Sequence, residues 1–123
     1  MPGAPRWDAA ADIRDHAFCP RFHEAVELIG RRWTGAIVRV LLGGPHRFSE
    51  LAAAVPGISE RLLAQRLREL EASGIVVRRV IPGPPVGVEY ELTRAGHDLE
   101  AVVTAVAAWA HRWGGTPEAR GRG

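Results

Sequence analysis

Residues 56–73 place the tightest constraint on the fold, because they predict one helix with two chemically different faces. Pro56 and Gly57 end whatever element precedes this segment, and the Ser59 hydroxyl can accept hydrogen bonds from the free N–H groups of a first helical turn. Residues 60–73 contain no Gly and no β-branched residue, and most of them are good helix formers. We therefore predict a helix of about four turns over residues 60–73.

The predicted helix separates an apolar stripe from a polar one. The apolar stripe follows the i, i+4, i+7 spacing and consists of Leu63, Leu67 and Leu70. The polar stripe has the same spacing on nearly the opposite side and consists of Arg61, Gln65 and Arg68. Arg can donate to both O6 and N7 of guanine, and Gln can pair with N6 and N7 of adenine. A helix with this pattern is either a solvated surface helix or one that reads DNA, and the flanking residues must decide between the two.

A second helix is predicted directly before this one. Ser49 is expected to cap a short helix that extends to residue 54, with Leu51 and Val55 pointing inward. A tight turn over residues 55–57 then leads into the helix with the polar stripe. Two helices joined by such a turn, of which the second carries outward donors, form a helix-turn-helix.

Further elements are predicted upstream of the helix-turn-helix. Apolar spacing indicates helices over residues 21–29 and 34–42, the second of them capped by Thr34. Residues 46–48 are expected to form a very short strand. Residues 7–16 form at most a short helix, which would need a partner surface to stay folded.

Two strands are predicted downstream. Residues 75–81 are rich in β-branched side chains, and residues 88–92 alternate apolar and polar side chains. The loop between them, residues 82–87, consists mostly of Pro and Gly. Since a helix-turn-helix followed by a β-hairpin is the order of elements in a winged helix, we predict a mostly α-helical winged helix-turn-helix with a small β-hairpin.

A final helix, capped by Thr93, is expected to run to about residue 113 and has a broad apolar side. Such a side either packs on the rest of its own domain or forms an interface with a second copy of the chain. We expect a homodimer. The residues expected in its interface are Phe22, Val102, Val103, Val106, Trp109 and Trp113.

The bulk composition is that of one globular domain, with 123 residues of which 46% are hydrophobic and 24% charged. Within it we expect an N-terminal arm with a possible short helix (1–17), a winged-helix DNA-binding core (18–92), a dimerisation helix (93–113) and a disordered tail (114–123). A net charge of +2 gives no global basic field. All sixteen basic residues, however, are Arg, the side chain best suited to bidentate contact with phosphate and guanine.

Several classes of protein are disfavoured by what the sequence lacks. A single Cys permits no internal disulfide. No apolar run approaches the ~20 residues that span a bilayer, and the first residues do not form a secretory signal, so we expect a cytoplasmic protein with no membrane partner. No phosphate loop, nucleophile elbow or paired-carboxylate pattern is present, and we therefore expect neither an enzyme nor a cofactor.

Several separated motifs resemble the HxlR-type helix-turn-helix regulators. They are Cys19-Pro20, LIGRRWT at 28–34, RFSEL at 47–51, PGIS at 56–59, LAQRLRELE at 63–71 and VEYELT at 88–93. Their order over residues 18–113 makes the match more specific than any one motif. The resemblance implies a bacterial or archaeal homodimer with a winged-helix fold, which binds a palindromic operator in double-stranded DNA as a repressor or an activator.

Both the helix-turn-helix and the wing are expected to contact DNA. The predicted DNA-binding residues are Arg47, Ser49, Ser59, Arg61, Leu62, Gln65, Arg68, Arg78 and Arg79. Two places depart from the family pattern. Ala64 stands where the family usually has Ser or Thr, and Val86 and Gly87 stand where the wing often carries a basic residue. Arg78 and Arg79, on the strand that leads into the wing, are expected to compensate.

Cys19 precedes Pro20 just before a predicted helix. A helix N-terminus with neighbouring basic groups, here His16, Arg21 and His23, is the environment in which reactive thiols occur. In some family members a Cys at this position responds to oxidants or electrophiles, so Cys19 is either a thiol sensor or a small buried residue that never reacts. The set of His16, Cys19 and His23 is one ligand short of a closed zinc site, and we expect no metal.

The sequence thus predicts a dimeric winged-helix regulator of transcription, with a thiol-reactive electrophile or another small molecule as its inducer. Trp33, Trp109 and Trp113 could line a pocket for an apolar ligand, although core or interface packing is the alternative use of each. The rival interpretation of the whole chain is a winged-helix protein-interaction module without operator binding. A steep salt dependence together with preference for one DNA sequence distinguishes the two.

Overall fold

The computed structural model describes residues 18–114. The chain divides into two compact units, Met1–Arg31 and Arg32–Gly123, which are described separately. The predicted arm with its short helix, residues 1–17, lies outside the described residues, as do residues 115–123 of the predicted tail. Gly114, expected to begin that tail, instead ends a helical turn.

The described part of the first unit is built around helix α2 (Pro20–Ile29), which agrees with the helix predicted over residues 21–29. Cys19 occupies the N-cap position, and its Sγ accepts a hydrogen bond from the Phe22 N–H at 3.5 Å. Pro20 suits the first helical position because its missing N–H would have no partner there. No residue of α2 is buried among the described residues; Phe22 and Val26 are exposed, whereas Leu28 and Ile29 are half-buried.

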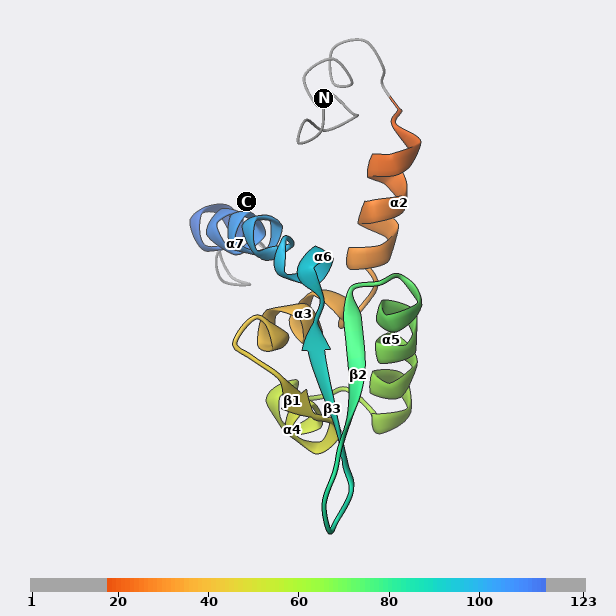
Figure 1. The fold of residues 1–123 in the computed structure, drawn as a ribbon. Coiled ribbons are helices and arrows are strands. Elements are labelled where there is room, and N and C mark those ends of the chain that lie inside the picture. Colours follow the sequence, from red (N-terminus) through yellow and green to blue (C-terminus); the bar gives the residue numbers. More distant parts are fainter. Residues whose placement is uncertain (1–17, 115–123) are drawn as a thin grey trace. The chain divides into compact units, whose positions relative to one another are not determined.

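The central part of the second unit, residues 34–92, combines three helices with a three-stranded antiparallel sheet (Figure 1). The helices are α3 (Thr34–Leu41), α4 (Phe48–Ala54) and α5 (Glu60–Ala72). The strands are β1 (His46–Arg47), β2 (Val76–Ile81) and β3 (Gly87–Leu92), in the order β1-β3-β2. The predicted hairpin is therefore confirmed, and the very short strand pairs with its second arm, His46 opposite Tyr90 and Arg47 opposite Glu89.

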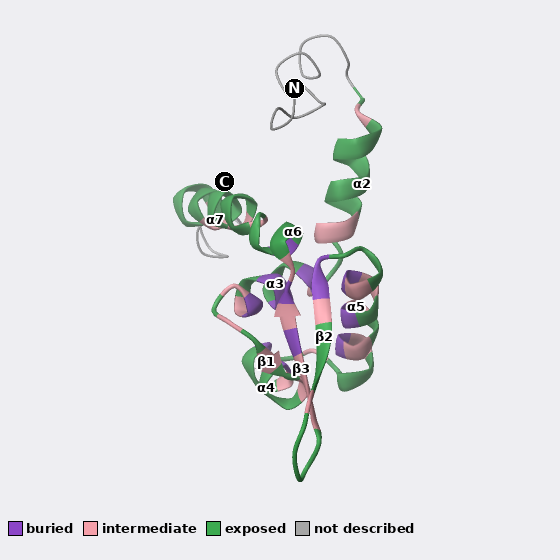
Figure 2. Cartoon of the chain, in the orientation of Figure 1, coloured by how far each residue is buried: buried purple, intermediate pink, exposed green. Residues whose placement is uncertain are grey.

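One apolar core lies between these helices and one face of the sheet, where buried residues cluster in Figure 2. Its buried hydrophobic residues are Ile37, Val38, Leu41, Leu51, Val55, Leu63, Leu67, Leu70, Ile75, Val76, Tyr90 and Leu92. All three leucines of the predicted apolar stripe of α5 belong to it, which confirms that stripe. Burial of each such side chain contributes about 1.5–3 kcal/mol to folding, and the core thereby fixes which side of α5 faces outward.

Two predicted helix caps are confirmed. The Ser59 hydroxyl accepts a hydrogen bond from the Leu62 N–H at 3.0 Å at the start of α5. The Thr93 hydroxyl accepts from the Gly96 N–H at 3.2 Å, and it also donates to the carbonyl oxygen of Gly74 at 2.5 Å. Both caps depend on residues within one turn of the helix they begin, which is why the sequence could reveal them.

Two other predicted caps are wrong, the first by one residue and the second by two. Thr34 is buried as the first residue of α3, and the cap before it is Trp33, which has a left-handed backbone with φ of +79°. Ser49 lies inside α4, because pairing of β1 with β3 holds Arg47 extended and the helix begins at Phe48. The Glu50 carboxylate then accepts from the Arg47 N–H at 2.7 Å and satisfies the helix start.

The prediction of one continuous C-terminal helix is also wrong. Thr93 caps the short helix α6 (Arg94–His97), which is followed by α7 (Glu100–Trp109) and a wider π-helical turn, η1 (Ala110–Gly114). At the break, the Leu99 N–H bonds the carbonyl of Gly96, three residues back, which tightens the turn. Gly96, a weak helix former, lies buried at this point. The apolar residues of the predicted helix therefore lie on α7 and η1, which leave α6 at an angle (Figure 1).

Helix α7 has no buried residue among the residues that the structure describes. Val106 is 62% exposed, and Trp109 and Trp113 are 63% and 65% exposed.

None of the helices between residues 18 and 114 is long and apolar enough to cross a membrane.

Candidate nucleic-acid interface

The outward face of α5 carries the predicted base-reading side chains. Arg61, Gln65 and Arg68 are all exposed, on the side of α5 that faces away from the core. Leu62 and Ala64 lie beside them and are half-buried. Ser59 is occupied as the helix cap, so its hydroxyl already has one partner. The face thus offers two guanidinium groups and one amide to a ligand outside the protein.

The turn that leads into α5 is held by Trp33, from the connector between α2 and α3. A Cβ built on Gly57 would lie 3.2 Å from Cη2 of Trp33, so only Gly lets the indole approach the turn this closely. The guanidinium carbon of Arg32 lies 5.1 Å from the centre of the Trp33 ring. The contact between Trp33 and Gly57 therefore fixes the start of α5 against the residues that precede α3.

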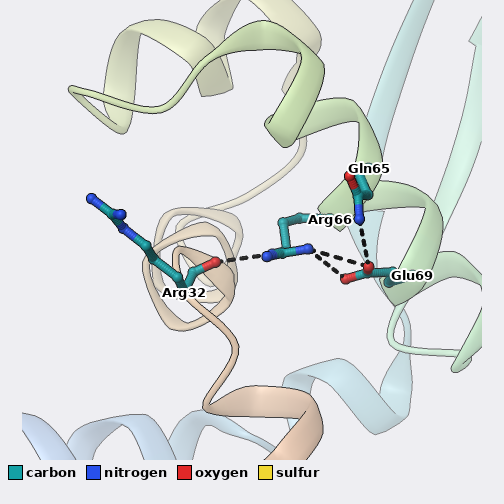
Figure 3. A network of polar contacts seen from close by, with 4 residues as sticks. All are labelled: Arg32, Gln65, Arg66 and Glu69. Carbon is teal, nitrogen blue, oxygen red and sulfur yellow. Dashed lines mark hydrogen bonds and ion pairs between the residues drawn. The ribbon is translucent and has the colours of Figure 1, made fainter.

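A second contact joins the same connector to the middle of α5 (Figure 3). Nε of Arg66 donates to the carbonyl oxygen of Arg32 at 2.9 Å, and Nη1 of Arg66 lies 3.2 Å from both carboxylate oxygens of Glu69. Glu69 in turn accepts from the Gln65 amide at 3.4 Å. Arg66 and Glu69 were not among the predicted site residues. Their i, i+3 spacing signals an ion pair, but the contact with Arg32 spans 34 residues and has no local signal.

The wing is the hairpin of β2 and β3, whose connecting residues project beyond the sheet (Figure 1). Nε of Arg79 lies 2.6 Å from a carboxylate oxygen of Glu91, so part of its charge is already neutralised. Arg78, opposite Tyr90 in the register, is exposed and has no ion-pair partner among the described residues. The two arginines therefore differ in how freely they can contact phosphate.

Arg47 supplies a further positive charge at the base of the wing. Its side chain is exposed, and its guanidinium lies against Gly87, the first residue of β3. Gly87 is one of the two wing positions where the resemblance led us to expect a basic residue. Ser49, nearby on α4, is also exposed and available for contact.

Cys19 is half-buried at the start of α2, where its sulfur accepts a hydrogen bond from the Phe22 N–H. The rings of Phe18 and His23 lie beside each other with centroids 5.3 Å apart. His16, the third neighbour considered for Cys19, lies outside the described residues. No group of three or more His, Cys, Asp or Glu side chains between residues 18 and 114 could hold a metal ion.

The residues predicted for a dimer interface lie on both units. Phe22 is exposed on α2, whereas Val102, Val106, Trp109 and Trp113 are exposed on α7 and η1, with Val103 half-buried. Trp33 is occupied by its contact with the turn at Gly57.

Helices α4 and α5, the turn between them and the β2–β3 hairpin define a winged helix-turn-helix protein. A sequence profile of the HxlR-like helix-turn-helix family matches residues 28–118. The chain belongs to this family of transcriptional regulators, and the resemblance seen in the sequence is confirmed.

Two regulators of Bacillus subtilis (strain 168) are similar to the chain over most of its length. The HTH-type transcriptional regulator YvaP, itself uncharacterized, is 47% identical over 95 residues, which cover 77% of this chain and 88% of YvaP. The HTH-type transcriptional regulator YodB is 45% identical over 98 residues, which cover 80% of this chain and 88% of YodB.

Solved structures of such regulators share the fold. The reduced form of YodB from B. subtilis matches with a TM-score of 0.72 and 46% identity over 78% of this chain and 94% of the YodB chain. YodB has also been solved after diamide treatment and bound to a quinone. The reduced form of the redox regulator HypR matches with a TM-score of 0.71 and 37% identity over 75% of this chain and 91% of the HypR chain.

Proposed function

We propose that this regulator binds an inverted-repeat DNA operator as a homodimer, with α5 in the major groove of each half-site. The observation that carries the proposal is the exposed row of Arg61, Gln65 and Arg68 on the side of α5 that faces away from the core. These are the side chains that pair bidentately with guanine and adenine in the major groove. Arg47, Arg78 and Arg79 would contact phosphates and set the register.

The exposed apolar face of α7 and η1 supports the homodimer. Val106, Trp109 and Trp113 are each more than 60% exposed. Such apolar surface is costly in water and is typical of a surface that a partner covers. A second copy related by a two-fold axis would place two α5 helices about one DNA turn apart.

A thiol-reactive signal is the second part of the proposal. Cys19 is a free thiol at the start of α2. YodB has been solved in reduced, diamide-treated and quinone-bound forms, and HypR in reduced and oxidised forms. We infer that an oxidant or electrophile modifies Cys19 and thereby changes DNA affinity. The chain would thus act by binding rather than by catalysis, in keeping with the regulators it matches.

Selection from a randomised duplex library tests operator binding. The enriched sequences should form one inverted repeat, and affinity for it should fall steeply as salt rises, because bound phosphates release counterions. At the same salt concentration, the affinity for a scrambled duplex should be lower than the affinity for the operator by a factor of at least about 10³. Equal, weak binding to both duplexes would favour the protein-interaction module instead.

A further inference from the structure

We propose that Glu69 is a positioning residue that sets which way the Gln65 amide faces DNA, and that Arg66 holds Glu69 in place. The inference rests on the proposed function, because it concerns how α5 would read an operator. Its basis is the chain of contacts from the Arg32 carbonyl through Arg66 and Glu69 to Gln65 (Figure 3).

The contact between Gln65 and Glu69 selects one of two amide orientations. Nε2 of Gln65 donates to Oε2 of Glu69 at 3.4 Å. An ionised carboxylate only accepts hydrogen bonds, so the amide nitrogen must face Glu69 and the amide oxygen must face away from it. One amide hydrogen and the carbonyl oxygen remain for a ligand, and reading of adenine requires one donor and one acceptor in a defined order.

Arg66 anchors Glu69 to the body of the protein. Its Nη1 lies 3.2 Å from both carboxylate oxygens, and its Nε donates to the carbonyl of Arg32 at 2.9 Å. The side chains of Arg66 and Glu69 are only 13% and 24% exposed, so water and salt screen their attraction less than that of a surface pair. Glu69 is therefore held by Arg66, which is itself hydrogen-bonded to Arg32 outside α5.

The same ion pair explains how a carboxylate can lie beside the proposed DNA-reading face. An unpaired Glu69 would repel nearby phosphates, whereas the guanidinium of Arg66 compensates its charge. As helix-stabilising contacts, pairs at i+3 and i+4 contribute little, so thermal stability alone would not reveal a positioning role. A change in base preference at one position of the operator would reveal it.

The test compares wild-type protein with Gln65→Ala, Glu69→Gln and Glu69→Asp. The probes are duplexes of the inverted repeat selected by wild-type protein, with all four base pairs at each half-site position in turn. Glu69→Gln replaces a pure acceptor by a group that also donates, so the amide of Gln65 can adopt both orientations. Glu69→Asp keeps the charge for Arg66 but shortens the reach to Gln65. It covers the case in which Glu69→Gln fails to fold.

At the position whose preference Gln65→Ala abolishes, both Glu69 variants should lose about tenfold in preference for the wild-type base pair. Glu69→Asp should bind scrambled DNA like wild-type protein, with the same salt slope. The matched control is Glu71→Gln, two residues further along α5, whose carboxylate has no partner among the described residues. It should leave every base preference unchanged.

The outcomes separate the two ideas. If Gln65→Ala abolishes a preference that both Glu69 variants retain, the positioning role is overturned while base reading by α5 stands. If Gln65→Ala changes no preference, base reading by Gln65 fails and the positioning role fails with it. Loss of the same preference in Gln65→Ala and in Glu69→Asp, with the Glu71→Gln control unchanged, supports the assignment.

Discussion

The guanidinium of Arg47 lies directly on Gly87 at the base of the wing. A Cβ built on Gly87 would lie 3.1 Å from Nη1 and 3.3 Å from Cζ of Arg47, so the absence of a side chain leaves room for this contact. Pairing of β1 with β3 sets Arg47 opposite Glu89, two residues further along the same strand. A positive charge from β1 therefore lies against Gly87, a position that has no side chain of its own.

Exchange of Gly87 for Val should displace the Arg47 guanidinium without unfolding the wing. Val suits a strand, and the displaced group is the end of a flexible, exposed side chain. We expect weaker binding to all DNA sequences alike and a salt slope smaller by about 1, as for Arg47→Ala. Titrations of an operator and a scrambled duplex at several salt concentrations measure both effects.

The double variant Gly87→Val with Arg47→Ala should bind no more weakly than Arg47→Ala alone. Arg94→Ala removes the same charge from α6, which follows the other end of β3, and serves as the control. Additive losses in the double variant would show that Gly87 acts independently of Arg47.

Truncation of Gln65 to Ala should cost about 1–3 kcal/mol of binding free energy on the operator and relax the preference at one base pair. Gln65 is exposed on α5, so the truncation leaves the core intact. Binding to scrambled DNA should be unchanged, and parallel titrations of the two duplexes show this. Equal losses on both would make Gln65 a phosphate contact.

Substitution of Val106 by Glu should produce a folded monomer that binds the operator weakly. Val106 is 62% exposed in the single chain, so a carboxylate there is hydrated in the monomer but would be buried without a partner in a dimer. Sedimentation at micromolar concentration gives the mass, and circular dichroism confirms folding. Thr104→Glu, an exposed position on another side of α7, should remain dimeric. A wild-type chain that sediments as a folded monomer would refute the dimer.

Replacement of Cys19 by Ser should separate DNA binding from the response to oxidant. Ser is a good N-cap residue, so it can take over the hydrogen bond that the thiol accepts from the Phe22 N–H. We expect operator affinity like that of the reduced wild-type protein, and no change on treatment with diamide. The thiol of the native protein should also react with a thiol reagent at neutral pH. Reaction only after unfolding would make Cys19 structural.

Local signals predicted much of this fold. The leucine stripe of α5 and the caps at Ser59 and Thr93 depend on residues within one or two turns, and the structure shows them as expected. The break between α6 and α7 was not predicted, because its local signal, Gly96, is also tolerated inside helices.

The sequence predicted the part of the candidate site that lies on a single helix. It did not predict the contacts that join residues from two different elements. The exposed row of Arg61, Gln65 and Arg68 follows from helical spacing alone. Two other contacts join residues that lie 34 or more positions apart along the chain. One is the hydrogen bond from Arg66 to Arg32, and the other is the close approach of Arg47 to Gly87. Such contacts follow from the packing of the connector on α5 and from the register of β1 with β3.

Methylation interference tests most directly whether α5 reads the major groove. Methylation of guanine N7 places a methyl group on the acceptor that Arg61 or Arg68 would contact. We expect N7 methylation to block binding in two clusters, with centres about ten base pairs or a multiple of that apart, and Arg61→Ala or Arg68→Ala to remove the interference at one guanine of each cluster. Tight, sequence-specific binding that is insensitive to N7 methylation at every guanine would contradict the account.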